Sequence, residues 1–213
     1  MPLQSLTQNM IILIAPEVTV KNEIKILHQL FEAGLAYYHF RKPQFSFEQH
    51  CKYLNEIDSQ YHSRIVTHYY HNLIEKFDLK GVHLQEQVRI DLNSRLEKYV
   101  QSYQSKGISV SSSFHEPEDI ENCNTKFNYH LLSPVFSSIS KQGYLGRGFD
   151  VTNSSKKIIG MGGINASTIK ETLASGFKGI GVLGGVWNSE QPIDSFKNIK
   201  HHYKENKNLH YEK

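Results

Sequence analysis

The chain contains 213 residues, of which 38% are hydrophobic and 21% are charged, and its formal net charge at pH 7 is +3. Ordered apolar clusters recur along this length, which excludes a disordered chain, and no apolar run approaches the roughly 20 residues that cross a bilayer. The small net charge, without a basic run interleaved with aromatic residues, also excludes a nucleic-acid-binding surface.

Strand-like and helix-like segments alternate along almost the whole chain. The predicted strands cover residues 11–15, 37–40, 64–67, 81–84, 108–112, 129–132, 158–160 and 179–183. The predicted helices cover residues 21–33, 47–57, 73–77, 92–105, 118–122, 168–175 and 193–202. Such alternation specifies a parallel sheet with right-handed crossovers, and eight repeats can close into a barrel.

We therefore expect one α/β domain over residues 1–213, a (β/α)8 or TIM barrel whose core spans about 10–203. Its sixth helix should be shortened, because residues 150–157 carry little helical signal, and residues 204–213 should form a frayed polar tail. An open, flavodoxin-like sheet is the alternative architecture.

Two strand-like segments near the C-terminal end each stop at paired glycines. Gly162-Gly163 follows the first segment, and Gly184-Gly185 follows the second. Glycine leaves the backbone N–H groups bare of side chains, so that an anion can approach closely. Two such turns on adjacent parallel strands predict the phosphate site that TIM barrels form after strands 7 and 8.

The chemistry of a TIM barrel lies at the C-terminal ends of its strands. Cations, hydroxyls and imidazoles dominate those positions in this chain, and acids are sparse: His39, Arg41, Lys42, His68, His83, Gln85, Glu86, Ser113, His115, Ser133, Ser138, Ser140 and Lys141. Such a rim suits a phosphorylated ligand and proton transfer by histidine. We expect no metal site, because the spacing of these histidines matches no compact ligand motif.

The same segments resemble the thiamine phosphate synthase and TenI superfamily over about residues 11–187. The similar segments are YYHFRKP (37–43), KGVHLQEQ (80–87), SFHEPED (113–119), HLLSPVFSSISK (130–141), GMGGI (160–164) and GIGVLGG (179–185). They occur in the order of the superfamily motifs and fall at predicted strand ends.

The resemblance implies a role for each matching residue. His115 would move protons in a TenI-like reaction, Arg41 would clamp a phosphate or pyrophosphate, and Ser113 would bind within the pyrimidine pocket. The remaining expected contacts divide into an anion loop of Ser138, Ser140 and Lys141, a phosphate site of Gly162, Gly163, Leu183 and Gly184, and further substrate contacts from His39, Lys42 and His68.

The chain also departs from the synthase pattern. The resemblance implies an Asn-Asp pair where this chain has Thr67-His68, and a second Asp where it has Gln87-Val88, with only Glu86 nearby. Magnesium prefers oxygen ligands, so these replacements argue against the synthase reaction. A tautomerase needs a histidine beside a phosphate anchor and no metal.

We therefore expect a TenI-like thiazole tautomerase that acts on a phosphorylated thiazole without a cofactor. The first alternative is a magnesium-dependent thiamine phosphate synthase that joins a pyrimidine pyrophosphate to thiazole phosphate. The second is a non-catalytic barrel that binds thiazole phosphate or thiamine phosphate. The absence of a secretion signal and of CxxC spacing predicts a cytoplasmic protein. Assembly into a homo-oligomer stays open.

Overall fold

Eight parallel strands, paired in chain order, close into a barrel. The computed structural model describes residues 10–137 and 145–211, with side chains as far as residue 207. The strands are β1 (Ile11–Ile14), β2 (Tyr37–Phe40), β3 (Ile65–Thr67), β4 (Gly81–Leu84), β5 (Ser109–Phe114), β6 (Tyr129–Leu132), β7 (Ile158–Met161) and β8 (Gly179–Val182). The closed barrel confirms the predicted TIM-barrel fold, and the open-sheet alternative is wrong.

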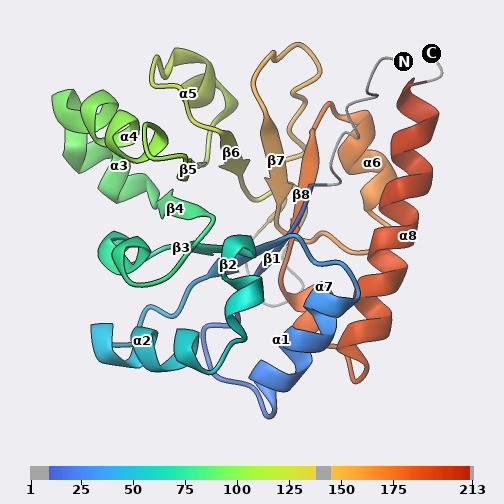
Figure 1. Cartoon of the computed structure of the whole chain (residues 1–213). Coiled ribbons are helices and arrows are strands. Elements are labelled where there is room, and N and C mark those ends of the chain that lie inside the picture. Colours follow the sequence, from blue (N-terminus) through green and yellow to red (C-terminus); the bar gives the residue numbers. More distant parts are fainter. Residues whose placement is uncertain (1–9, 138–144, 212–213) are drawn as a thin grey trace, which may run out of the picture.

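Helices surround this barrel (Figure 1), and α8 lies along its outside against α6, α7 and α1. The α-helices are α1 (Glu23–Glu32), α2 (Phe47–Asn55), α3 (Glu86–Leu92), α4 (Leu96–Gln104), α5 (Pro117–Asn122), α6 (Ile169–Ala174), α7 (Gly184–Trp187) and α8 (Pro192–Tyr211). The 3-10 helices are η1 (Ser59–Arg64), η2 (His71–Glu75) and η3 (Asn93–Arg95). The described residues between β6 and β7 contain no helix, in agreement with the predicted shortening.

Two helical predictions were wrong. The sequence predicted no helix at α3, which buries none of its residues and therefore has no apolar stripe to reveal it. The prediction of a frayed tail from residue 204 also fails, since α8 continues to Tyr211. Lys and Glu are good helix formers even without an apolar face, and His201 pairs with Glu205 one turn later at 3.1 Å.

The barrel separates two cores, because successive side chains of a strand point to opposite faces. The outer core lies between strands and helices and receives Tyr38 and Phe40 from β2. The inner core is apolar on the side of β1, β6 and β7, with Ile12, Leu131 and Ile159. Facing it, β2 and β4 place fully buried histidines inside the barrel, so half of the interior is polar.

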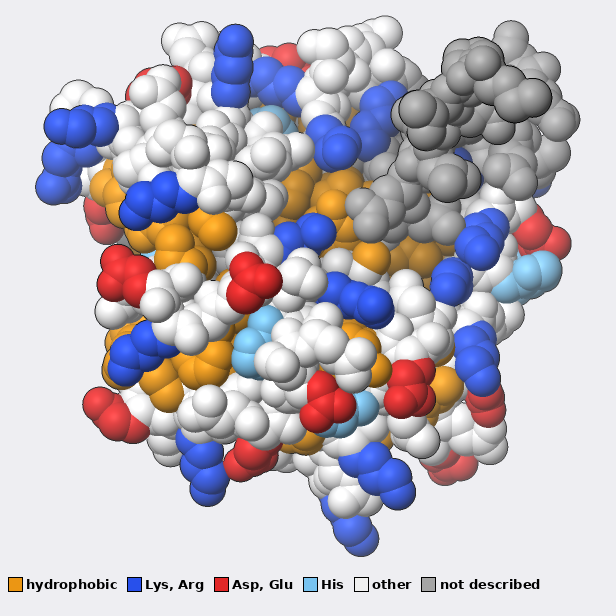
Figure 2. Space-filling model, viewed as in Figure 1, with side chains coloured by type: hydrophobic (Ala, Val, Ile, Leu, Met, Phe, Trp, Pro, Cys, Tyr) orange, Lys and Arg blue, Asp and Glu red, His pale blue; other side chains and the backbone are white. Residues whose placement is uncertain are grey.

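The surface carries charges of both signs. On the face that Figure 2 shows, lysine and arginine side chains are scattered over the molecule, with acidic side chains among them. No helix in the described part of the chain is both long enough and apolar enough for a bilayer crossing.

Lys42 does not lie where its predicted role in substrate binding requires. Its side chain has no exposed surface, and its Nζ donates to Glu23 Oε2 at 2.8 Å. The same carboxylate accepts from Tyr53 Oη at 2.6 Å, and Tyr53 in turn bonds to Tyr38. Burial lowers the pKa of Lys42, and the bond to Glu23 opposes that shift. The lysine therefore joins β2 to α1 and α2 outside the barrel.

Replacing Lys42 by methionine should destabilise the fold. Lys42→Met leaves the Glu23 carboxylate buried without its cation, and removing one partner of a buried ion pair costs about 3–5 kcal/mol. The free energy of unfolding in urea measures this loss. The control Lys25→Met, at an exposed position of α1, should change it by less than about 0.5 kcal/mol. Equal free energies of unfolding for the two variants would show that the buried ion pair is not important for stability.

Candidate functional site

A cavity of about 740 Å³ opens at the C-terminal ends of the strands. The predicted rim residues that line it are Arg41, His68, Gln85, Glu86, Ser113, His115, Ser133 and Leu183. A larger cavity of about 970 Å³ lies outside the barrel between α1 and α2. We place the candidate site in the first cavity, here called the mouth cavity, because side chains from the ends of many strands converge there.

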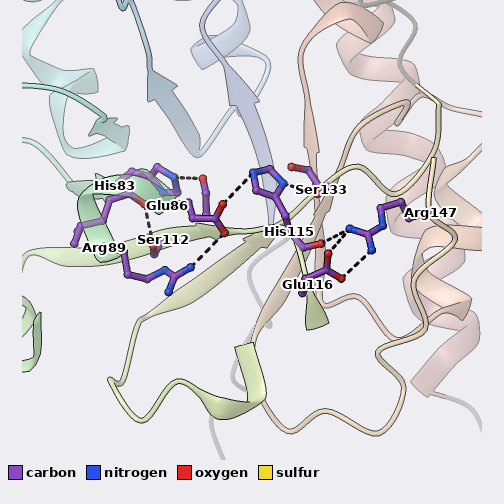
Figure 3. A network of polar contacts seen from close by, with 10 residues as sticks. His83, Glu86, Arg89, Ser112, His115, Glu116, Ser133 and Arg147 are labelled. Atoms are coloured by element: carbon purple, nitrogen blue, oxygen red, sulfur yellow. Dashed lines mark hydrogen bonds and ion pairs between the residues drawn. The ribbon is translucent and has the colours of Figure 1, made fainter. Parts of the chain in front are cut away.

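His115 is held at the edge of the mouth cavity between two partners (Figure 3). Its Nδ1 lies 2.8 Å from the Ser133 carbonyl oxygen, which can only accept, so Nδ1 carries the proton. In the neutral ring, Nε2 is therefore the basic nitrogen. A carboxylate oxygen of Glu86 lies 3.8 Å from Nε2 and can stabilise the positive charge when that nitrogen takes a proton.

Two arginines support this arrangement. Arg89 contacts the Glu86 carboxylate at 3.4 Å and lies over the Phe114 ring, 3.9 Å from its centroid. Arg147 donates to the His115 carbonyl oxygen at 3.1 Å and to Glu116 at 2.9 Å, as Figure 3 shows. Sequence reasoning missed Arg147, because no strand-end rule selects a residue in the long connection between β6 and β7.

Arg41 reaches the mouth cavity, but its guanidinium is already paired with Glu17. Glu17 follows β1 by three residues, so the rule that selected the other rim residues could have found it. The other anion-binding residues that the resemblance implied in the β6–β7 connection, Ser138, Ser140 and Lys141, lie outside the described residues.

The glycine turns lie at the ends of β7 and β8 as predicted. Gly162 and Gly163 have φ values of 93° and 66°, in the left-handed region that favours glycine. A Cβ atom on Gly163 would lie 2.6 Å from the Phe136 Cβ atom, so this turn must pass close to the β6–β7 connection. The second turn leads into α7 at Gly184. The first backbone amides of this helix lack intrahelical acceptors. The phosphate role of Leu183 and these glycines stays a prediction.

Three histidines fill the polar half of the barrel interior. His39 Nδ1 lies 2.9 Å from His68 Nε2, and His39 Nε2 lies 2.7 Å from Tyr129 Oη. His83 bonds through both ring nitrogens to serine hydroxyls, each at 2.8 Å. The predicted role of His39 in substrate binding does not fit this position, because the side chain has no exposed surface.

Burial keeps these imidazoles uncharged. It lowers the pKa of His39 to about 3, and it lowers the pKa values of His68 and His83 well below the ordinary value. Neighbouring positive charge opposes protonation of His68 and His83 further. At neutral pH the cluster is therefore a neutral hydrogen-bonded group, of which His68 also lines the mouth cavity.

Comparison with known proteins adds to this geometry. A family model described as thiamine monophosphate synthase matches residues 11–186. The chain belongs to this family. The match confirms the superfamily resemblance, and no curated protein matches the chain.

Solved structures of other proteins share the fold. A thiamine phosphate pyrophosphorylase from Bacteroides thetaiotaomicron is 29% identical, with a TM-score of 0.68 over 92% of this chain and 98% of that chain. One from Pyrococcus furiosus is 15% identical, with a TM-score of 0.75 over 94% and 97% of the two chains. A 3-hexulose-6-phosphate synthase is 13% identical, with a TM-score of 0.63 over 91% and 99%. The last two show the fold alone.

The magnesium that the family resemblance implies does not fit the described residues. Within the parts of the chain that the structure describes, the close group of metal-ligating side chains is His39, His68 and His83, without a carboxylate. Magnesium takes oxygen ligands, and neutral imidazoles do not replace them. We therefore derive no step of the chemistry through this ion.

The buried histidines should make this family member sensitive to acid. His130, packed against Phe114 in the outer core, has a pKa that burial lowers to about 4. In the unfolded chain His130 has a pKa near 6.5, so below about pH 6.5 the unfolded chain binds a proton that the folded chain does not. The stability present above about pH 6.5 is therefore lost as the pH falls from about 6.5 to about 4. Between pH 7.5 and 5, His130 alone should remove about 2 kcal/mol.

The variant His130→Gln should lose that much less stability than the wild type over the same range. Urea unfolding at the two pH values measures the difference, and His201→Gln, exposed on α8, is the control. Parallel pH curves for wild type and His130→Gln would contradict the prediction.

Proposed function

We propose that this chain is a TenI-like isomerase that moves a proton within the ring of a thiazole carboxylate phosphate. The observation that carries the proposal is His115, whose Nδ1 proton is held by the Ser133 carbonyl while Nε2 stands beside the mouth cavity. Fixing one nitrogen of an imidazole in this way sets the tautomer and leaves the other as a general base.

The proposed reaction is balanced within the substrate. Nε2 of His115 takes a proton from one ring position, and the electrons of the broken bond shift into the ring. The imidazolium, with Glu86 at 3.8 Å, then returns the proton at the second position. No oxidant, reductant or metal is consumed.

The substrate phosphate would bind at the turns after β7 and β8. Backbone amides of Gly163 and Gly184, beside Leu183 on the cavity wall, are the proposed donors. Arg41 would add a cation by exchanging its Glu17 partner for the phosphate. Placing the dianion there leaves the ring of the substrate within the mouth cavity, where His115 and Ser113 lie.

The second candidate function is thiamine phosphate synthesis from a pyrimidine pyrophosphate and thiazole phosphate. The similarity to the Bacteroides pyrophosphorylase, which extends over 92% of this chain, favours it. This reaction would require another way to neutralise the charge of pyrophosphate, because the acids expected to hold magnesium are missing. His68 stands in the place of one of them.

Replacing His115 by glutamine should greatly slow the isomerisation. The amide cannot take up the proton, and general acid–base groups contribute typically about 10²–10⁴-fold to a rate. We expect kcat for conversion of the thiazole carboxylate phosphate tautomers to fall by at least about 100-fold, with little change in KM. The control His28→Gln, on α1, should match the wild type. Unchanged turnover in His115→Gln would exclude the role of this residue.

The synthase reaction is tested separately. Purified protein with saturating magnesium, pyrimidine pyrophosphate and thiazole phosphate should give no thiamine phosphate above the background without protein, because the magnesium ligands are missing. Product that depends on magnesium would instead establish the synthase. Tight binding of thiazole phosphate by calorimetry, with neither reaction, would identify a non-catalytic binding protein.

A further inference from the structure

We propose that His39, His68 and His83 bind one divalent transition-metal ion of the zinc class inside the barrel, beneath the mouth cavity. This site is independent of the proposed isomerisation, which uses His115 and no metal. The proposal rests on the arrangement of the three rings, on the groups that hold them and on the access from the cavity.

The three side chains are arranged as a ligand set. One ring nitrogen of each lies within 4.8 Å of the others, and the ring centroids are 4.2, 5.0 and 5.3 Å apart. Zinc binds imidazole nitrogens at about 2.0–2.1 Å in tetrahedral sites, which places two such nitrogens roughly 3.3 Å apart. The contact of 2.9 Å between His39 Nδ1 and His68 Nε2 is already close to that value. Rotation of His83 can bring in the third nitrogen.

Hydroxyl groups are in place to hold the nitrogens that face away from the ion. Tyr129 Oη contacts His39 Nε2 at 2.7 Å, and Ser111 and Ser113 contact the two nitrogens of His83. A metal-bound histidine usually donates its other N–H to such a partner, which fixes its tautomer and orientation. Whichever nitrogen His83 gives to the ion, a serine remains for the other.

Hydrogen bonds within the described part of the protein do not satisfy every ring nitrogen of the three histidines. His68 is only 6% exposed, and its Nδ1 is buried without a hydrogen-bond partner among the described residues. An unpaired buried polar atom costs free energy, so the present bonds do not fix His68 as firmly as they fix His39 and His83, and its ring can turn toward an ion. Neutral imidazoles bind zinc, cobalt, nickel or copper well and bind magnesium poorly. The three rings are already neutral, so binding requires no net loss of protons.

Three ligands leave a fourth position open. His68 and Ser113 both line the mouth cavity, so that position is expected to face the cavity, where water or an oxygen of a bound molecule can occupy it. Histidines 39 and 83 are fully buried below it. The ion would therefore form part of the floor of the cavity.

Cobalt binding to the metal-free protein tests the site. The full chain is treated with a chelator, dialysed and titrated with Co²⁺ under visible absorption, then with Zn²⁺ in competition. We expect one equivalent of Co²⁺ with the d–d bands of a four- or five-coordinate ion, displaced by Zn²⁺. Failure of the wild type to bind Co²⁺ or Zn²⁺ would overturn the proposal.

A matched pair of variants locates the ion. His68→Gln should weaken binding by more than the roughly 10- to 100-fold that loss of an outer hydrogen-bond partner causes. His130→Gln removes another buried histidine with an unpartnered nitrogen, outside the barrel interior, and should bind as the wild type does. Equal binding by His68→Gln and the wild type, or equal loss in both variants, would overturn the assignment.

A measurement on the wild type covers the case in which His68→Gln fails to fold. Nitrogen-15 NMR of the imidazoles during a zinc titration should show three histidines shifting together at one equivalent, and His115→Gln should show the same three. Shifts confined to histidines on the surface would overturn the proposal.

Discussion

The polar half of the barrel interior depends on one constraint, which is that buried imidazoles must find their hydrogen-bond partners inside a closed sheet. A neutral imidazole has one donor and one acceptor nitrogen, and each is costly to leave unpaired away from water. His39 and His83 meet this requirement through His68, Tyr129 and serines of β5. The interior of β2 to β5 is thus specified by hydrogen bonds, whereas that near β1, β6 and β7 is specified by apolar packing.

This buried network and the mouth cavity belong to the same strands. Because side chains alternate along a strand, a residue that faces the interior is followed two positions later by one that faces the mouth. Ser113 bonds to His83 inside the barrel, and His115 comes two residues after it at the cavity edge. The position of His115 therefore depends on how firmly β5 is held by its interior bonds.

The same alternation explains what could be predicted from the sequence. The eight strands followed from the alternation of strand-like and helix-like segments, the two turns followed from their paired glycines, and His115 followed from its place after a strand. The position of the Lys42 side chain was predicted wrongly, because a shift of one residue along a strand reverses the face on which a side chain lies. Arg41 consequently points to the mouth and Lys42 to Glu23. The imidazole cluster could not be predicted from spacing either, since its members lie on β2, on β4 and directly after β3, and only the folded sheet defines the register of these strands.

The charges around the mouth cavity determine how an anion could bind there. Arg41 is paired with Glu17, Arg89 with Glu86, and Arg147 with Glu116. A phosphate that recruits one of these arginines must displace a carboxylate, so the gain is only the difference between two charge-assisted bonds. Backbone amides at the two glycine turns carry no such competitor, because a peptide N–H attracts an anion without a counter-charge. Among the described groups, the glycine turns rather than the arginines should therefore contribute most of the affinity for phosphate.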